Sequence, residues 1–363
     1  MIGAASRPIL ITGGAGFIGS NLADRLASEG HEVLVYDALT RPGVERNLGW
    51  LKSRHGARIR SVVADIRDGA LLAEAARGAK AVFHLAAQVA VTTSLHEPRE
   101  DFEINVAGTL NLLEAARRSE TPPPVIFAST NKVYGDLADL DFSLTDNGYQ
   151  PVNAALRAHG IGEHRPLDFH TPYGCSKGAA DQYVLDYARS FGVPTAVLRM
   201  SCIYGQRQMG TEDQGWVAHF LIQALEGKPI TLYGDGHQVR DILDVRNAVE
   251  AYVAAWQRID RISGRAFNLG GGPANAVSLN TLLGHIADIT GKRPEVHFAE
   301  WRAGDQRYFV ADARAGRMAL GLDVQVPWRA GVGALARWLA AERQLPLPDD
   351  EARVIPLRMA AAL

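Results

Sequence analysis

A glycine-rich turn near the N-terminus limits the possible folds of this 363-residue chain more than any other feature. It follows the apolar residues Ile9–Ile11, runs through Thr12–Gly19 and leads into a helical pattern over 17–28. A strand, a glycine turn and a helix N-terminus aim main-chain N–H groups at a pyrophosphate, and small residues allow close approach. The alternative is a turn that only packs a strand on a helix. The expected dinucleotide contacts are Gly13, Gly16, Phe17, Ile18 and Gly19.

An acidic residue stands where such a turn needs one, about 20 positions further along the chain. Val33–Tyr36 is typical of a second buried strand and is followed directly by Asp37. A carboxylate at this place accepts hydrogen bonds from a free ribose 2′-hydroxyl and repels a 2′-phosphate. NAD is therefore favoured over NADP as the cofactor, despite the nearby Arg41 and Arg46.

Short apolar runs alternate with helical patterns through the first two hundred residues, which is typical of βαβ units and a parallel sheet. Helical periodicity is clearest at 101–118, with Phe102 in its apolar stripe, and at 173–191. We predict an α/β fold: a Rossmann-type doubly wound parallel sheet with a smaller C-terminal substrate-binding lobe. The expected strands are 8–12, 33–36, 59–63, 81–85, 124–129 and 194–199.

The second half of the chain is less regular, with helical patterns near 214–226, 244–258, 278–290 and 328–342 and apolar runs at 230–233 and 265–269. We expect residues 1–203 and 236–275 to form the NAD-binding domain, 204–235 and 276–345 the substrate lobe, and 346–363 a tail. Residues 135–170 form an unusually long loop. A lid over the active site and an ordinary surface insertion both agree with this pattern.

A tyrosine and a lysine one helical turn apart indicate the chemistry. Tyr173 and Lys177 share a helix face, where the ammonium favours the phenolate and lowers its pKa from about 10, which makes it a base near neutral pH. Thr130 ends an expected strand at the sheet edge where open α/β sheets bind ligands. Together the three residues predict redox chemistry on an alcohol. The structural alternatives are a partly buried helix aromatic and a strand-end threonine bonded to the main chain.

The composition excludes several classes of partner. A net charge of −2 without a dense basic run argues against nucleic acid, and the apolar runs are shorter than a membrane span. Met1–Pro8 is too short for a signal peptide, so we expect a cytoplasmic protein. Cys175 and Cys202 cannot build a disulfide framework, and the histidines lack metal-ligand spacing, so we expect no metal.

In order and spacing, the motifs resemble the extended short-chain dehydrogenase/reductase family over nearly the whole chain except the tail. The resemblance implies that Tyr173 is the base, that Lys177 holds the phenolate and the nicotinamide ribose, and that Thr130 hydrogen-bonds a sugar hydroxyl. It also implies adenine contacts from Asp65 and Ile66. The matching residues are the glycine run, Asp37, Asp65-Ile66, Leu85-Ala86-Ala87 along the cofactor, Asn105 among the cofactor-binding positions, Thr130, Val133-Tyr134-Gly135, Tyr173 and Lys177.

The residues after Thr130 separate the subfamilies. Sugar nucleotide 4,6-dehydratases of this family carry an Asp-Glu pair there, because elimination of water needs an acid and a base. Asn131 and Lys132 stand at these positions here. Dehydration is therefore disfavoured, which leaves reversible oxidation and reduction at one carbon.

Longer strings resemble the branch of the family that contains the CDP-paratose 2-epimerases: Ser129–Asp136, Pro172–Tyr183, Arg199–Gly205 and Gly210–Trp216. The resemblance implies an NAD-dependent epimerase that oxidises a nucleotide-activated hexose at C2, lets the 2-keto sugar rotate and returns the hydride to the opposite face. Gln206, where related sequences often have proline, departs from the pattern.

A sugar that turns over must hang from a firmly held nucleotide. Arg207, Arg240 and Arg302 are candidates for the diphosphate because guanidinium groups suit phosphate, although each is equally compatible with a surface ion pair. Cys202 is expected beside both sugar and nicotinamide, with a buried inert thiol as the alternative. The expected substrate-binding residues are Gln88, Val89, Thr130, Asn131, Lys132, Ser201, Arg207, Arg240 and Arg302.

Three other functions use the same motifs: a 4-epimerase of a UDP-, GDP- or dTDP-sugar, an oxidoreductase that releases NADH, and a catalytically silent NAD-binding protein on the same fold. A silent protein has no need of Tyr173, Lys177 and Thr130 together. The family resemblance also implies a homo-oligomer that pairs the helices at 101–118 and 173–191.

Overall fold

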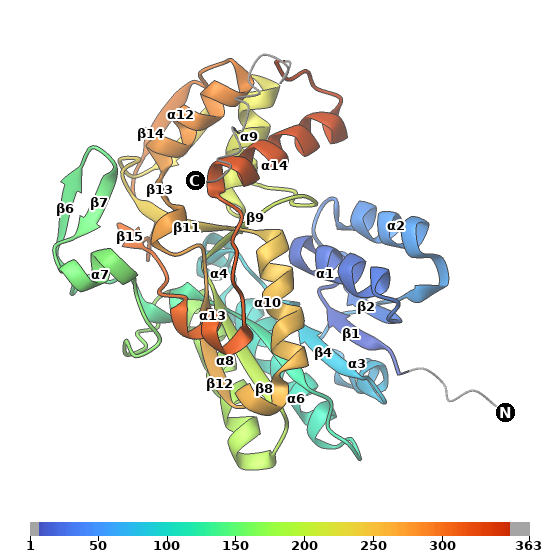
Figure 1. The fold of residues 1–363 in the computed structure, drawn as a ribbon. Helices are drawn as coiled ribbons and strands as arrows, with labels where there is room; N and C mark the ends of the chain where they lie inside the picture. The colour runs from blue at the N-terminus through green and yellow to red at the C-terminus, as the bar shows by residue number, and fades with distance from the viewer. Residues whose placement is uncertain (1–6, 349–363) are drawn as a thin grey trace, which may run out of the picture.

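The computed structural model describes residues 7–348, and its centre is a seven-stranded sheet in the order β12-β8-β5-β4-β1-β2-β3 (Figure 1). Every neighbouring pair is parallel. The strand order reverses between β1 and β4, which opens a crevice at the carboxyl ends of the strands. The predicted doubly wound sheet is therefore confirmed. Its strands are β1 (Ile9–Thr12), β2 (Val33–Asp37), β3 (Ile59–Val63), β4 (Ala81–His84), β5 (Val125–Thr130), β8 (Thr195–Met200) and β12 (Arg265–Leu269).

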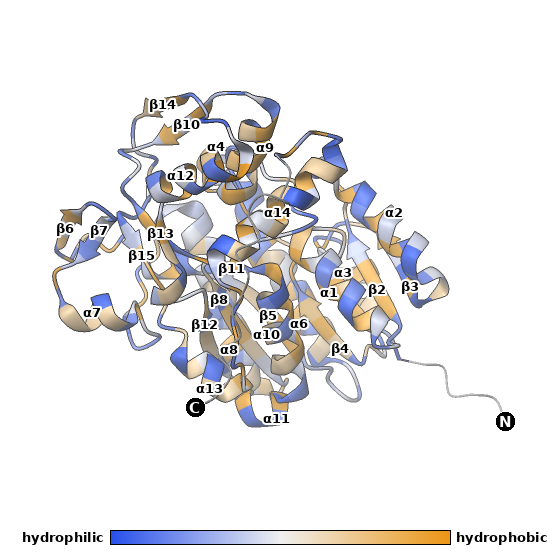
Figure 2. Cartoon of the chain, turned by 45° about the horizontal axis from the view of Figure 1, so that its top comes forward, coloured by the Kyte–Doolittle hydropathy of each residue, from blue (hydrophilic) through white to orange (hydrophobic). Residues whose placement is uncertain are grey.

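Helices cover both faces of this sheet, as Figure 1 shows. Apolar residues of β1 and β4 pack against α1, α2 and α10 on one face and against α3, α6 and α8 on the other. Figure 2 shows hydrophobic residues along the central strands and hydrophilic residues on outer turns of helices such as α2. The helices are α1 (Phe17–Ser28), α2 (Val44–His55), α3 (Gly69–Ala76), α6 (Gly108–Arg117), α8 (Thr171–Phe191) and α10 (Val245–Gln257).

The helix expected at 101–118 is interrupted by a π-helical turn. The chain runs from α5 (Pro98–Phe102) through η2 (Glu103–Ala107) into α6. A π turn holds more residues than an α turn and shifts the helical phase, so the residues before it face differently from what a 3.6 period predicts. Phe102, expected in the apolar stripe, is 55% exposed, whereas Asp101 is fully buried. The stripe prediction is wrong at this position.

The smaller lobe has its own apolar core, formed mainly by three helices with Tyr204, Phe220, Leu282 and Val332 at its centre. Its elements are α9 (Trp216–Glu226), α12 (Leu279–Thr290), α14 (Trp328–Arg343), the parallel pair β10 (Ile230–Tyr233) and β14 (Val296–Ala299), and a small sheet of β9 (Cys202–Tyr204), β11 (Val239–Asp244), β13 (Ala276–Ser278) and β15 (Tyr308–Phe309).

Part of the segment 236–275, which we expected in the main sheet, lies in the small sheet instead. Residues 239–244 form β11, which pairs with β9, β13 and β15 in the small sheet and does not return to the main sheet. Residues 245–269 do return, as α10, the short α11 (Ile259–Ile262) and β12. A fully buried strand has the same apolar pattern in either sheet, so the sequence alone does not reveal its partner. Short α13 (Arg314–Leu320) adjoins β12, and the expected tail lies outside the described residues from 349 onward.

The 135–170 segment is an insertion that packs on the side of the small sheet. It contains the hairpin of β6 (Phe142–Thr145) and β7 (Gly148–Pro151), followed by α7 (Ala154–His159). Leu137 and Ile161 pack against Phe309, and Ile161 forms a β-bridge to Ala311. Figure 1 shows the hairpin at the periphery of the molecule. This placement agrees with a surface insertion rather than with a lid.

None of the helices within 7–348 is long and apolar enough to cross a membrane.

Candidate active site

A cleft of about 480 Å³ lies along the carboxyl ends of the main-sheet strands and extends to the start of α9. It gathers residues that are far apart in the sequence, because parallel strands end at one edge of the sheet. The predicted site residues in its wall are Gly13, Gly16, Phe17, Ile18, Gly19, Asp37, Asp65, Ile66, Leu85, Ala86, Ala87, Val89, Thr130, Tyr173, Ser201, Cys202 and Arg207. Those outside its wall are Gln88, Asn105, Asn131, Lys132, Lys177, Arg240 and Arg302.

The glycine turn at one end of the cleft has the shape that a pyrophosphate needs. A Cβ atom on Gly19 would lie 2.2 Å from the main-chain oxygen of Gly13, and one on Gly13 would lie 2.7 Å from the nitrogen of Ala86. Gly13 also has a φ of +68°, which favours glycine. Gly16 precedes α1, and no side chain caps that helix. The N–H groups of the first turn are thus suited to bind an anion, so the turn fits a dinucleotide.

Asp37 stands at the end of β2 and holds the glycine turn in place. Its Oδ2 accepts a 2.9 Å hydrogen bond from the nitrogen of Ala15, and its Oδ1 accepts one of 2.9 Å from the nitrogen of Leu39. Its carboxylate can still accept hydrogen bonds from a ribose, because each oxygen offers two lone pairs.

At the expected adenine site, Arg67 forms an ion pair with Asp65 at 2.7 Å. Arg67 lines the cleft but was not predicted, since an arginine in a loop carries no distinctive sequence signal.

Tyr173 and Thr130 meet in the middle of the cleft. Tyr173, in the first turn of α8, is only 9% exposed, and Thr130 ends β5. The pKa of Tyr173 is raised to about 12, mainly by burial and also by Asp101, while a hydrogen bond with Thr130 opposes the shift. The net shift is opposite to the predicted direction because the cost of burying a phenolate exceeds the stabilisation by its neighbours. A phenol of this kind needs an additional positive charge before it can act as a base near neutral pH.

Lys177 lies one turn after Tyr173, but its ammonium is directed at β5. Nζ donates a 2.7 Å hydrogen bond to the main-chain oxygen of Ala128 and lies 4.3 Å from the ring centre of Phe127. The pKa of this ammonium is lowered to about 7 because the effect of burial outweighs the opposing effects of Asp181 and Asp101. A lysine this close to neutrality can change its protonation state during a reaction at physiological pH.

Asn131 and Lys132 join the end of β5 to the smaller lobe. The Asn131 amide donates to Oε1 of Gln306 at 3.2 Å. The Lys132 ammonium donates to the main-chain oxygen of Gly304 at 2.9 Å and lies 3.7 Å from Oδ1 of Asp305. Burial lowers the pKa of Lys132. Both residues therefore hold segment 304–306 against Thr130, a role that the sequence did not suggest.

Each of the three candidate arginines already has partners. Arg240 is buried and donates to Oδ1 of Asp305 at 2.7 Å. Arg302 stacks on Tyr233, 3.8 Å from the ring centre, and lies 3.4 Å from Asp213. The Arg207 guanidinium lies 3.9 Å from the ring centre of Trp50, which ties the lobe to α2. Their role at a diphosphate stays a prediction.

Ser201 and Cys202 follow β8 and border the cleft. The Ser201 hydroxyl donates to the main-chain oxygen of Asp241 at 3.1 Å. The indole N–H of Trp216 donates to Sγ of Cys202 at 3.4 Å. Burial raises the pKa of the Cys202 thiol, so this thiol is a weak nucleophile.

Gln88 and Asn105 form part of the support beneath the cleft. The Asn105 amide donates to Oδ1 of Asp101 at 3.2 Å and to Oγ of Ser176 at 3.0 Å. The Gln88 amide donates to Oδ1 of Asp101 at 3.1 Å. Both side chains therefore contact protein groups behind Tyr173 rather than the cleft.

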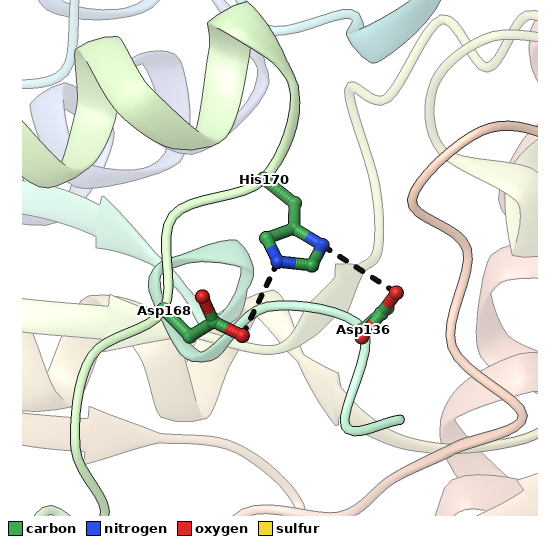
Figure 3. Close-up of side chains that lie close together, drawn as sticks. All are labelled: Asp136, Asp168 and His170. Atoms are coloured by element: carbon green, nitrogen blue, oxygen red, sulfur yellow. Dashed lines mark ion pairs between the residues drawn. The ribbon is translucent and has the colours of Figure 1, made fainter. Parts of the chain in front are cut away.

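Outside the cleft, Asp136, Asp168 and His170 lie together just before α8, with possible ligand atoms within 4.8 Å of one another (Figure 3). Nδ1 of His170 lies 3.4 Å from Oδ2 of Asp136, and Nε2 lies 3.2 Å from Oδ2 of Asp168. The two ring nitrogens face opposite ways, so a single ion cannot replace both contacts. The cluster joins the two ends of the insertion.

Comparison with known proteins agrees with this geometry. The model of the NAD dependent epimerase/dehydratase family matches residues 9–270. The CDP-paratose 2-epimerase of Salmonella typhi is 43% identical over 340 residues, which are 92% of this chain and 99% of that protein.

Two solved structures are similar over nearly their whole length. The UDP-glucose 4-epimerase of Thermotoga maritima with UDP-glucose has a TM-score of 0.78 and 30% identity, covering 93% of this chain and 99% of that one. The UDP-glucuronic acid 4-epimerase of Bacillus cereus, in complex with UDP-glucuronic acid and NAD, has a TM-score of 0.80 and 27% identity, covering 92% and 99%. The predictions of the family and of NAD as the cofactor are confirmed: this chain belongs to the NAD dependent epimerase/dehydratase family.

Proposed function

We propose that this protein epimerises a CDP-hexose at C2 through a transient 2-keto sugar and keeps its NAD throughout the cycle. The observation that carries the proposal is the end of β5, where Thr130 stands beside Tyr173 and is followed by an amide and an ammonium instead of two carboxylates. A 43% identical relative with the name CDP-paratose 2-epimerase supports C2 as the carbon and cytidine as the base.

The residues of the cleft have distinct tasks in this reaction. Bound NAD supplies the hydride acceptor, which becomes the donor on the way back. Tyr173 accepts the proton of the C2 hydroxyl while that carbon is oxidised and returns a proton when the ketone is reduced. Thr130, within hydrogen-bonding reach of Tyr173, orients the same hydroxyl. Between the two steps the keto sugar turns about its bond to the diphosphate, while the lobe keeps hold of the nucleotide.

The nucleotide end of the substrate is assigned to the smaller lobe. Arg240 and Arg302 lie in segments that Lys132 and Asp305 connect to the end of β5. The distance between the diphosphate and Tyr173 would then decide which sugar carbon meets the phenol. A 4-epimerase differs only in this distance, so it stays the nearest alternative.

A panel of CDP-, UDP-, GDP- and dTDP-hexoses, incubated with the protein in deuterated water and followed by NMR, tests the proposal. We expect inversion at C2 of a CDP-sugar without added NAD and without solvent deuterium on carbon. A substrate deuterated at C2 should keep its label in the product. Uptake of solvent deuterium at carbon would show proton abstraction from carbon, and inversion at C4 would support the alternative.

We also propose a cytoplasmic homo-oligomer. Three aromatic side chains on α5 and α8, namely Phe102, Tyr183 and Phe191, are about half exposed and could be covered by a second copy of the chain. Light scattering of the wild type and of Tyr183→Glu tests the assembly: we expect the substitution to lower the mass. A wild-type mass equal to one chain would contradict this proposal.

A further inference from the structure

A buried carboxylate lies directly behind the proposed base, and the reaction as described does not use it. Asp101, in α5, has no exposed surface, although its chain neighbour Phe102 is turned outward. Burying a carboxylate and exposing a phenylalanine at adjacent positions is costly unless the carboxylate is well bonded. The burial of Asp101 next to an exposed Phe102 therefore indicates a role for this carboxylate in the interior of the protein.

All hydrogen-bonding neighbours of this carboxylate donate to it. Oδ1 accepts bonds from the amides of Asn105 at 3.2 Å and Gln88 at 3.1 Å, and Oδ2 accepts one from the hydroxyl of Ser176. An arrangement with donors on both oxygens stabilises the ionised form. Burial raises the pKa of Asp101, but Ser176 and Lys177 oppose that shift. The net shift of this pKa is upward, while the three donors favour the ionised form of the carboxylate.

The network ends on the helical turn that carries the chemistry. Ser176 lies between Tyr173 and Lys177 on α8, and its Oγ also lies 3.2 Å from the main-chain oxygen of Tyr173. On the other side, the nitrogen of Tyr173 donates to Oγ of Ser94 at 3.1 Å. Because Ser176 has a single hydroxyl proton, which it donates to Asp101, the bond between Ser176 and Asp101 ties this turn to α5, while Ser94 holds the nitrogen of Tyr173.

The charge of Asp101 also reaches the reactive groups. It raises the pKa of Tyr173 and that of Lys177. The other titratable groups around the pair are satisfied: Asp181 on α8 forms a 2.9 Å ion pair with Arg199 of β8. His84 of β4 is neutral at physiological pH, since burial and Lys177 lower its pKa to about 3.

We propose that Asp101 is a positioning residue of this enzyme: through Ser176 it fixes the turn of α8 that carries Tyr173 and Lys177, and its negative charge faces both. The proposal rests on the function proposed above in one respect only, namely that Tyr173 is the base. It assigns no contact between Asp101 and substrate or cofactor.

Asp101→Asn is the first test, because asparagine keeps the shape but removes the charge. We expect kcat to fall about tenfold as the contact with Ser176 weakens. The acid limb of the pH profile of kcat/KM should also move to lower pH by about 0.5–1 unit, since the phenolate forms more easily without a neighbouring anion. Glu103→Gln, which removes a half-exposed carboxylate two residues further along, is the matched control and should change neither quantity.

Ser176→Ala separates the two effects and covers the case in which Asp101→Asn does not fold. It leaves the charge in place, so kcat should fall while the acid limb does not move to lower pH. If kcat of Asp101→Asn falls but the acid limb of kcat/KM does not move, Asp101 has only a structural role. If Ser176→Ala has the wild-type kcat, the contact between Asp101 and Ser176 has no role in the reaction. Either outcome overturns the proposal.

A measurement without turnover distinguishes failure of this inference from failure of the proposed function. Protein labelled with ¹³C at the tyrosine ring and loaded with NAD is titrated by NMR, and Tyr173→Phe identifies the signal. We expect the Tyr173 midpoint to be lower in Asp101→Asn than in the wild type. Equal midpoints would refute the role of the charge, even if no nucleotide sugar in the panel is a substrate.

Discussion

The ammonium of Lys177 donates a 2.7 Å hydrogen bond to the main-chain oxygen of Ala128, which fastens α8 to β5 one turn after Tyr173. The bond explains how a lysine can be almost completely buried, since the charged group keeps a strong acceptor. It also means that the ammonium stabilises the framework of the site.

Lys177→Met should flatten the dependence of stability on pH. The pKa of Lys177 in the folded protein is about 7, below the ordinary lysine value of 10.5, so between these two values the unfolded chain binds more protons. The contribution of Lys177 to the free energy of unfolding therefore rises between pH 7 and pH 10.5. This contribution is smallest below pH 7. Urea unfolding from pH 7 to 10 checks this, with exposed Lys52→Met as the control for loss of a lysine. An unchanged slope in Lys177→Met would contradict the burial of a titrating ammonium.

Tyr173→Phe should reduce epimerisation by about 10²–10⁴-fold, the usual contribution of a positioned acid–base group. NAD should remain bound, because the glycine turn and Asp37 are untouched. Rates on the identified nucleotide sugar and calorimetric NAD titration are the two measurements. Substantial residual turnover would show that another group moves the proton.

Gly19→Ala and Gly49→Ala form a matched pair of substitutions in helices. A Cβ atom on Gly19 would meet the main chain of Gly13 at 2.2 Å, whereas one on Gly49 in α2 meets nothing within 4 Å. We expect Gly19→Ala to lower stability by about 1–3 kcal/mol and to weaken NAD binding. Gly49→Ala should raise stability by about 0.5–1 kcal/mol. Thermal unfolding and NAD titration of both variants decide the matter, and equal effects would mean that the turn is looser than described.

Asp37→Asn should weaken NAD binding about 10- to 100-fold, the cost of losing hydrogen bonds to a charged group. The preference for NAD over NADP should shrink at the same time, because the 2′-phosphate no longer meets an anion. Dissociation constants for both dinucleotides give the ratio directly. An unchanged ratio would leave cofactor choice to another residue, with Arg41 in the cleft wall as the next candidate.

Lys132→Met should raise the KM for the nucleotide sugar about tenfold while the affinity for NAD stays the same. The substitution keeps the length of the side chain but removes its hydrogen bond to Gly304 and its contact with Asp305. Lys228→Met, which removes a surface lysine paired with Glu226, is the control. An equal loss of NAD affinity would mean that Lys132 supports the whole domain instead of the junction with the lobe.

Features that are local in the chain were predictable. The glycine turn, Asp37 and the Tyr173–Lys177 spacing each lie within one strand, turn or helix, so the geometry of that element brings their groups together. The strand-end position of Thr130 followed from the same alternation of elements. These residues all came from short-range patterns. Asp37, Thr130, Tyr173 and most of the glycine turn line the cleft, whereas Lys177 does not.

Features that depend on distant segments were not predictable. The apolar sequence of β11 is compatible with a buried strand in either sheet. Only its pairing with β9, β13 and β15 shows that it belongs to the lobe. The contact of the Arg207 guanidinium with Trp50, more than 150 positions away in the chain, was not predictable either, and the role of Arg207 at a diphosphate stays a prediction. The raised pKa of Tyr173 likewise results from burial, which a sequence does not display.

The sequence by itself determined the type of fold and the cofactor, and it predicted the reacting residues, because each depends on a short motif whose spacing is set by the backbone. The tertiary structure alone decided how those residues are supported. Asp101 is buried in the turn that precedes the π turn, and Lys132 reaches Gly304 because the lobe folds back onto the end of β5. Contacts of this kind join residues whose separation in the chain says nothing about their distance in space.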